Sequence, residues 1–388
     1  MQLYLLTLFY YSANAILNVV IPLRGESLGA SNATIGMIMG SYLLTAMLLR
    51  PWAGHVIQKH GPIKVLRAIL AVNALALILY AFTGLGGYLM ARMLQGACTA
   101  FFSMALQLGI INALPDKERS QGISMYSLCS YLPGILGPLL AVGIWQAGEL
   151  DYIAVTLIAI AIVTGVIGYS ANMEPQAATQ PQGLEQKGQV GAMLQAIGRY
   201  ANNPQLFRCS LLMLGGSIVF GSVTTFIPLY AEEVAGGGAA AYLMIQAGVV
   251  VASRCALRKH IPSDGKWRTG YMMGIMAMLT AAAASVSYST LGGAVFFYAG
   301  ALLMGLAQAL LYPTLTTYLS FVSPAASRNV FIGLFIATAD LGVSLGSILM
   351  GPLADLFSYS TMYMVCAVLG AIMIGAAYGR REPKVEVS

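Results

Sequence analysis

Two charged residues stand well inside long apolar runs of this 388-residue chain, and each could carry chemistry. At about 1.5 Å of rise per residue, Arg92 would lie roughly 8 Å and Asp340 roughly 16 Å from the nearer ends of their helices. A guanidinium stays protonated and presents a fork of donors that fits a carboxylate, whereas an aspartate can exchange a proton with water. We therefore expect Arg92 to bind an anionic group and Asp340 to carry a proton. The alternative is that both are structural charges held by polar neighbours.

Uncharged polar residues recur at helical spacing in other apolar runs. Asn14 and Asn18 are four residues apart and so share one face of a helix, as do Gln308 and Tyr312. A further run offers Tyr126. Such side chains could contact a polar solute, or they could join neighbouring helices by hydrogen bonds worth about 0.6 kcal/mol each. The spacing leaves both interpretations open.

The apolar runs that carry these residues predict an all-α membrane protein. Hydrophobic residues make up 58% of the chain and charged residues only 9%, against about 25% charged in a soluble domain. A helix needs about 20 apolar residues to cross a bilayer. Twelve such transmembrane helices are predicted: Leu3–Leu23, Ile35–Val56, Val65–Gly84, Gly87–Leu114, Ile123–Ala147, Tyr152–Ala171, Leu206–Tyr230, Ala239–Leu257, Thr269–Tyr288, Ala294–Phe321, Val330–Leu353 and Tyr359–Gly379.

The basic residues predict the orientation of these spans. Of the 20 Lys and Arg residues, all but Arg24 and Arg92 fall beside every second gap between spans. Loops on the cytoplasmic side of membrane proteins are enriched in Lys and Arg. The pattern predicts a multi-pass protein of the cell (inner) membrane with both termini in the cytoplasm. It also accounts for the net charge of +6 without a nucleic-acid partner.

Cysteine and histidine give no sign of a metal, a cofactor or an enzyme. The five cysteines are widely spaced within apolar runs, and the three histidines fall at expected helix ends. Such spacing fits neither a disulfide framework nor a metal site. No pairing of a nucleophile with a base stands out either. We expect no cofactor, no metal and no catalysis, and a monomer embedded in the lipid bilayer.

The chain divides into two pseudo-symmetric halves of six spans each. Residues 1–171 would form one bundle, 172–205 a cytoplasmic linker rich in Gln, Ala, Gly and Pro, and 206–388 a second bundle. The halves echo each other, since Lys59–Pro62 (KHGP) after the second span has a counterpart in Lys259–Pro262 (KHIP) after the eighth. Related halves with a substrate site between them, near the middle of the bilayer, are typical of secondary transporters.

Two pairs of glycines predict close packing of helices. Gly36 and Gly40 lie in the second span, and Gly342 and Gly346 lie in the eleventh. Small residues four positions apart let two backbones approach each other. Because both pairs fall in the outer halves of their spans, we expect them to pack together at the seam between the bundles. The alternative is that these glycines face lipid.

Several stretches together resemble signatures of the major facilitator superfamily. The run Arg50–Gly61 resembles the family's loop motif between helices two and three, and Arg92–Gly96 resembles its fourth-helix motif. Gly134–Pro138 (GILGP) is similar to the fifth-helix motif of its proton-driven antiporters. Proline removes a helical hydrogen bond, so we expect Pro138 to kink that helix. The motif residues expected to serve conformational change are Arg50, Gly54, Gln58, Lys59, Gly61, Gly134, Gly137 and Pro138.

One motif position departs from the family, and two runs point to a narrower resemblance. Gln58 stands where the loop motif usually has an acid that latches the halves, so an ion-pair latch is not expected there. The runs Ser12–Leu23 and Leu94–Ser103 resemble exporters of staphylopine-type metallophores. That resemblance implies a small amino-acid-derived chelator with several carboxylates as substrate. The family's cavity-lining helices, with Tyr126 added from the fifth span, imply a substrate-binding set of Arg92, Asn14, Asn18, Gln95, Tyr126, Gln308 and Tyr312.

The sequence therefore predicts a proton-coupled secondary exporter that works by alternating access between two halves. It would carry an anionic metallophore past Arg92, with Asp340 carrying the proton. The nearest alternative is a multidrug:proton antiporter for lipophilic cations, in which Asp340 pairs with the cation. A non-transporting membrane sensor is the remote alternative.

Overall fold

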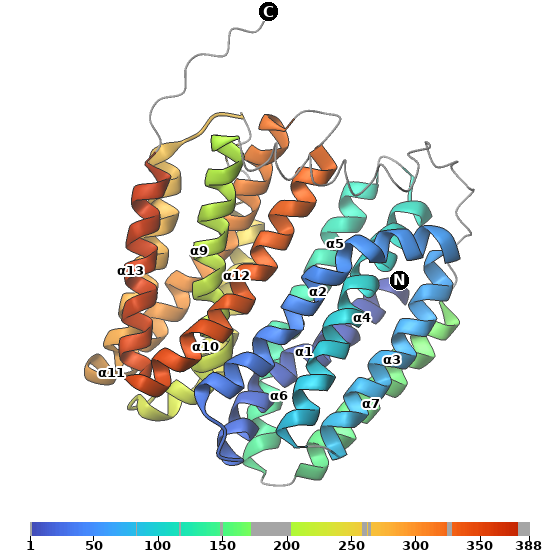
Figure 1. The fold of residues 1–388 in the computed structure, drawn as a ribbon, viewed down its shortest axis with the longest axis horizontal. Helices are drawn as coiled ribbons and strands as arrows, with labels where there is room; N and C mark the ends of the chain where they lie inside the picture. The colour runs from blue at the N-terminus through green and yellow to red at the C-terminus, as the bar shows by residue number, and fades with distance from the viewer. Residues whose placement is uncertain are drawn as a thin grey trace, which may run out of the picture.

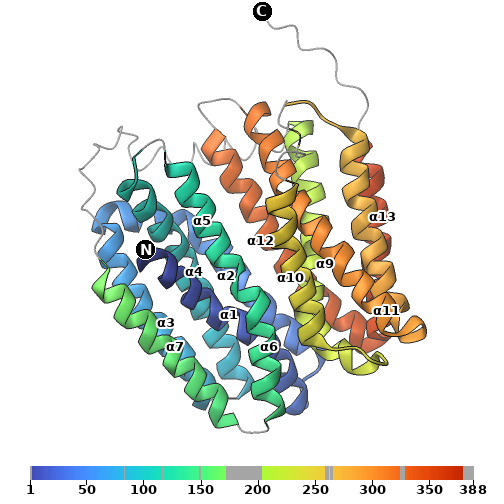
Figure 2. The same cartoon turned by 180° about the vertical axis from the view of Figure 1, so that it is seen from behind.

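A computed structural model describes residues 2–82, 84–115, 118–147, 150–171, 203–257, 262, 265–323 and 328–378. Within these residues the secondary structure is helical, with no strand. Figure 1 and Figure 2 show two helical bundles side by side. Most of the predicted linker falls on 172–202, and most of the counterpart motif Lys259–Pro262 falls on 258–261; both stretches lie outside the described residues.

Each bundle is formed by one half of the chain. The first bundle contains α1 (Gln2–Ser27), α2 (Asn32–His60), α3 (Pro62–Phe82), α4 (Leu85–Ala113), α5 (Arg119–Tyr131), α6 (Pro133–Gln146) and α7 (Leu150–Ser170). The second contains α9 (Pro204–Tyr230), a 3₁₀ turn (Ala231–Glu233), α10 (Ala239–Ala256), α11 (Thr269–Val322), α12 (Arg328–Leu356) and α13 (Tyr359–Ala377).

Twelve helical crossings are present in the described part of the chain, as predicted. Eleven helical stretches are long and apolar enough to span a membrane. One of them, α11, has 54 residues and would be about 80 Å long if straight, far more than the roughly 30 Å hydrocarbon core. Gly293 interrupts α11 with φ 71° and ψ −164°, a conformation that glycine adopts readily. Two crossings therefore run on either side of Gly293.

The helical hydrogen bonding of the fifth crossing is interrupted before Pro133, and the kink expected at Pro138 stays a prediction. The helix α5 ends at Tyr131 and α6 begins at Pro133, whereas Pro138 lies within α6. Proline is well tolerated at the first position of a helix because its missing N–H would have no intrahelical partner there. The interruption falls there because Pro133 lacks the N–H that would continue α5.

The glycines of α2 pack against α12, but not against the glycines of α12. A Cβ at Gly36 would collide with the carbonyl oxygen of Ser347, and one at Gly40 would lie 2.7 Å from that of Ser344. Gly342 and Gly346 instead face α9 within their own half. The expected glycine-on-glycine seam was therefore wrong. Positions 342 and 344 lie on different sides of one helix, so α12 can pack closely on two neighbours at once.

The two bundles separate toward one end of the molecule, which we call the basic face. It is the end where Lys59, Lys64, Arg119 and Arg254 lie at or near helix ends. A cavity of about 1200 Å³ lies there between α5 and α10, and Cys255 is among its lining residues. The thiol of Cys255 is exposed, whereas the other four cysteines are buried. The structure is thus open toward the basic face, and Cys255 reports on that opening.

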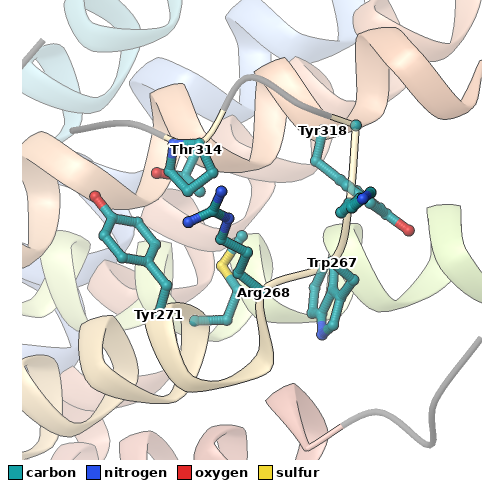
Figure 3. Close-up of a pocket in the computed structure, with 9 residues that line it drawn as sticks. Trp267, Arg268, Tyr271, Thr314 and Tyr318 are labelled. Atoms are coloured by element: carbon teal, nitrogen blue, oxygen red, sulfur yellow. The ribbon is translucent and has the colours of Figure 1, made fainter. Parts of the chain in front are cut away.

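Trp267, just before α11, contacts two helices of the second bundle. Its indole Nε1 donates to the carbonyl of Ala377 at 3.2 Å, and its ring meets Tyr318 edge-on at 5.0 Å. The pocket that Trp267, Arg268, Tyr271, Thr314 and Tyr318 line in Figure 3 has a volume of only about 10 Å³. That is about the space of one water molecule, so this pocket is not a solute site.

At the opposite end, Asp355 of α12 joins the two halves through the start of α2. Its carboxylate accepts hydrogen bonds from the backbone N–H groups of Asn32 and Ala33, both at 2.8 Å. Tyr359 adds a 2.7 Å bond to the side chain of Asn32. The first N–H groups of a helix have no intrahelical partner and attract negative charge. Asp355 therefore closes the end opposite the basic face.

We expect Asp355→Asn to weaken this closed end. The substitution removes the negative charge at the helix N-terminus, an interaction worth about 0.3–1 kcal/mol, so the equilibrium ratio of the conformation open to the basic face to the one closed there should fall about 2- to 5-fold. The rate at which a membrane-impermeant maleimide alkylates Cys255 measures the population of the open conformation. An unchanged rate would show that Asp355 does not stabilise this conformation. Asp355→Glu, which keeps the charge, is the matched control.

Candidate functional site

A second cavity, of about 230 Å³, lies deeper between the two bundles. Its polar wall is built by α1 and α5 on one side and by α9, α10 and α11 on the other. Tyr131 lines both this cavity and the larger one, so the two meet at its side chain. Among the described residues, the lining includes no charged side chain and carries hydroxyl and amide groups from Tyr11, Asn14, Asn18, Ser130, Gln246 and Gln308.

Arg92 lies directly behind this cavity and is completely buried. Its Nη1 donates to Oδ1 of Asn14 at 2.7 Å, and its Nη2 donates to Oδ1 of Asn18 at 2.9 Å. The guanidinium also lies 5.3 Å from the ring centroid of Tyr42, close enough for a cation–π contact. Its predicted contact with an anionic solute stays a prediction. In this conformation the two asparagines stand between Arg92 and the cavity.

The local sequence explains how Arg92 reaches this position. Asn14 and Asn18 are one helical turn apart on α1, so a single guanidinium fork can engage both. A Cβ at Gly96 would collide with the carbonyl oxygen of Tyr42, so only glycine lets α4 pack this closely on α2. That close approach brings the ring of Tyr42 beside Arg92. The fourth-helix motif therefore positions the charge through its glycine as well as its arginine.

The other predicted contact residues fall into two groups. Gln308 lines the cavity. Gln95 is 3% exposed and accepts a 2.6 Å hydrogen bond from Tyr80 of α3, inside the first bundle. Tyr126 lies behind Tyr11, with 3.2 Å between their hydroxyls.

Tyr312 belongs with the residues outside the cavity wall. Its ring packs against Phe335, with 5.9 Å between centroids. The structure therefore brings Asn14, Asn18 and Gln308 together at the cavity, with Arg92, Gln95, Tyr126 and Tyr312 behind or beside them.

Gln246 of α10 is a cavity residue that sequence reasoning missed. It is only 7% exposed, lines the cavity, and donates a 3.0 Å hydrogen bond to Gln308 of α11. Its amide oxygen is buried and has no hydrogen-bond partner among the described residues. The available signal was an uncharged polar residue near the middle of an apolar span. Such residues inside a bundle commonly mark a pathway for a solute.

Asp340 of α12 forms an ion pair with Arg50 of α2, at 2.8 Å between carboxylate and guanidinium. The side chains are 12% and 29% exposed, respectively. The sequence suggested that Arg92 and Asp340 were the only deep charges, which is wrong. Arg50 was read as part of a loop motif, yet it lies within α2, well before its end at His60. The pair therefore links the two halves along the same seam as Gly40.

The remaining motif residues take structural positions near the basic face and around α6. Gly61 ends α2 with φ 84°, which explains the glycine there, while Gln58 and Lys59 are exposed just before it. A Cβ at Gly54 would lie 3.3 Å from the sulfur of Met104. Gly137 faces Ala15 of α1 and Gly134 faces Ala247 of α10, so α6 lies close to both halves.

Comparisons with known proteins agree with this architecture. The family model described as Major Facilitator Superfamily matches residues 3–299 and 265–388. The staphylopine export protein of Staphylococcus aureus (strain Mu50) is 50% identical over 374 residues, covering 96% of this chain and 94% of that protein. An uncharacterized MFS-type transporter of Pseudomonas aeruginosa (strain LESB58) is 24% identical over 369 residues, covering 92% of this chain and 87% of that protein.

Solved structures show the same fold. A mutant of the nucleoside transporter NupG matches with a TM-score of 0.79 at 15% identity, over 97% of this chain and 98% of that one. A POT family transporter in complex with 5-aminolevulinic acid matches with a TM-score of 0.77 at 10% identity, over 97% and 94%. The family match over nearly the whole chain, together with the apolar crossings, leads to one conclusion: this chain is a multi-pass membrane transporter of the major facilitator superfamily.

Proposed function

We propose that this protein exports a small, anionic, amino-acid-derived metallophore of the staphylopine type from the cytoplasm. The observation that carries the proposal is the buried cation at Arg92, which backs a central cavity whose described lining holds amides and hydroxyls but no carboxylate. An anionic solute would meet donors and a nearby positive charge there. The 50% identity to a staphylopine export protein over nearly the whole chain favours the same substrate class.

The alternative substrate class, lipophilic cations, is less well matched by this cavity. A cation entering it would meet the field of Arg92, and like charges repel in a medium of low dielectric constant. Asp340, which would pair with the cation in a multidrug antiporter, already has a cationic partner in Arg50. We therefore favour an anionic substrate over a cationic drug.

We infer that the basic face is the cytoplasmic face, because loops rich in Lys and Arg stay in the cytoplasm. The structure would then represent the state that loads substrate from inside the cell. Arg254 lines the larger cavity. Its guanidinium donates a hydrogen bond of 2.9 Å to the hydroxyl of Tyr131, where the two cavities meet. Because Glu118 also lines this mouth, Arg254 would give an anion a local contact rather than a net positive field. Closing this end and separating α2 from α12 at the other would complete alternating access.

We further propose that the Arg50–Asp340 pair couples export to proton entry. Protonation of Asp340 would remove the charge that holds Arg50 and so loosen α2 from α12. Re-formation of the pair would follow proton release to the cytoplasm. The coupling residue thus lies on the helix pair that would have to separate during transport.

Transport into everted membrane vesicles tests the proposed function. Vesicles containing the protein should accumulate added staphylopine when a proton gradient is imposed, and a protonophore should abolish the accumulation. Ethidium, a lipophilic cation, should not be accumulated above control vesicles. Accumulation of ethidium without staphylopine would instead identify a multidrug antiporter. Mass spectrometry of cells that lack the gene should show the substrate retained inside.

A further inference from the structure

The hydrogen bonds of Arg92 fix the orientation of two amides at the cavity. A guanidinium has donors and no acceptor, so the amide atom that faces it must be the oxygen. Both asparagines satisfy this rule, with Oδ1 of Asn14 at 2.7 Å and Oδ1 of Asn18 at 2.9 Å from Arg92 nitrogens. The assignment of oxygen and nitrogen in each amide therefore follows from chemistry. Each NH₂ group must then point away from Arg92.

Those two NH₂ groups are available to a solute. Asn14 and Asn18 are half-buried and both line the 230 Å³ cavity. Among the residues that the structure describes, neither NH₂ group has a hydrogen-bond partner, although the oxygen of each amide is occupied. The two asparagines consequently present donors to the cavity, while their oxygens are held by Arg92. A carboxylate fits such a wall because its oxygens only accept.

The facing wall has a different character. Gln246 and Gln308 share one hydrogen bond of 3.0 Å, so whichever way the two amides are turned, the pair retains one free acceptor and one free donor. Gln246 is more than nine-tenths buried, and within the described parts of the chain its oxygen has no partner. A buried polar group without a partner is costly. An N–H group of a bound solute would satisfy it.

We propose that this cavity binds a zwitterionic amino-acid unit in one orientation, with its carboxylate on Asn14 and Asn18 and its N–H on Gln246. Arg92 is then a positioning residue, which holds both asparagines with their donors turned toward the substrate and does not touch it. The proposal rests on the proposed function and deepens it, because it names the chemical unit that the same cavity recognises.

Isosteric substitution of the asparagines separates recognition from folding. Asn14→Asp and Asn18→Asp each keep an oxygen for Arg92, replace the cavity-facing NH₂ with an oxygen and add a negative charge. Binding is measured by calorimetry on the full-length protein in lipid nanodiscs. The probes are staphylopine, N-carboxymethyl-L-phenylalanine and the fully methyl-esterified form of each. The wild type should bind each acid at least about tenfold more tightly than its ester.

In the two variants this preference for acid over ester should fall to about one or below, because an oxygen now faces the carboxylate. Ester affinity should change little. Equal loss for acid and ester would mean that the asparagines act only structurally, and an unchanged preference would overturn the donor assignment. Ser12→Ala, on α1 but bonded back to Leu8 within its own helix, is the control that should bind like the wild type.

The acceptor side is tested with Gln246→Met, which keeps the side chain's length but removes the amide. N-carboxymethyl-L-phenylalanine should bind several-fold more weakly, whereas its N-methylated analogue, which has one fewer N–H, should lose less. An equal loss for both probes would remove Gln246 from the proposed site.

A double-mutant cycle tests whether Arg92 acts through the asparagines. Arg92→Gln should weaken acid binding by about tenfold or more in the wild type, but by less than about threefold when Asn14 and Asn18 are both alanine. Equal losses in the two backgrounds would mean that Arg92 contacts the carboxylate directly. If Arg92→Gln does not reach the membrane, the two aspartate variants still decide the donor assignment.

The outcomes also separate this inference from the proposed function. Staphylopine export with no acid preference, or with one that survives both aspartate substitutions, would overturn the inference alone. An asparagine-dependent preference for N-carboxymethyl-L-phenylalanine, with no binding of staphylopine, would overturn the substrate and retain the recognition mode.

Discussion

Asp340→Asn should abolish proton-driven export while leaving the protein in the membrane. Asparagine is similar in size and still hydrogen-bonds, but it cannot release a proton and so cannot alternate between pairing with Arg50 and freeing it. We expect accumulation driven by a proton gradient to fall at least about tenfold, which corresponds to about 1.4 kcal/mol of lost coupling. Exchange of labelled for unlabelled substrate, which needs no net proton movement, should persist.

The measurement is the loss of a preformed pH gradient when substrate is added to everted vesicles. Wild-type vesicles should show it, and Asp340→Asn vesicles should not. Removing one member of a buried pair also leaves the other charge unpaired, which is destabilising. Arg50→Gln combined with Asp340→Asn removes both charges and controls for that effect. Substrate-evoked proton movement in either variant would exclude Asp340 as the proton carrier.

The position of this pair shows why coupling could act on the whole transporter. Arg50 and Asp340 join α2 to α12, and those two helices also pack through Gly36 and Gly40 farther from the basic face. A change in charge within this helix pair would shift the two helices relative to each other along their whole contact, because close-packed interfaces deform little. Protonation would therefore bias the same seam that has to open. The proposed asparagine site and the proposed proton site both lie along the interface between the two bundles.

Hydrophobic runs in the sequence were enough to predict the twelve crossings. They are a strong signal because every backbone polar group in a membrane must be satisfied within the helix. Even the two crossings within α11 were separated correctly, on either side of Gly293. Helical spacing likewise placed Asn14 and Asn18 on one face, and both line the cavity.

Contacts between distant segments were beyond what one sequence could predict. Nothing in the spacing of residues indicates that Arg50 pairs with Asp340, or that Arg92 binds both asparagines. Gly342 and Gly346 were recognised as a packing motif, but the motif does not name its partner helix, which is α9. The sequence does not show what Gln246 contacts, and its role emerges only from the 3.0 Å hydrogen bond to Gln308.

Gly36→Leu should prevent the transporter from adopting the conformation seen here. Any Cβ at this position collides with the carbonyl oxygen of Ser347, and a backbone atom cannot rotate away as a side chain can. Overpacking a close interface costs about 1–3 kcal/mol, so the equilibrium ratio of the conformation open to the basic face to the one closed there should fall about 5- to 150-fold. Transport should be lost, because alternating access needs both conformations.

Alkylation of Cys255 from the basic face measures this shift, since Cys255 is the exposed cysteine and lines the larger cavity. Its labelling rate should fall in Gly36→Leu, in proportion to the remaining population of the open conformation. Gly143→Leu is the matched control, because a Cβ at Gly143 meets nothing within 4 Å. Labelling as fast as in the wild type would mean that α2 and α12 can separate without closing the basic face. The two ends of the seam would then move independently, and a proton bound at Asp340 could not drive the opening of the far end.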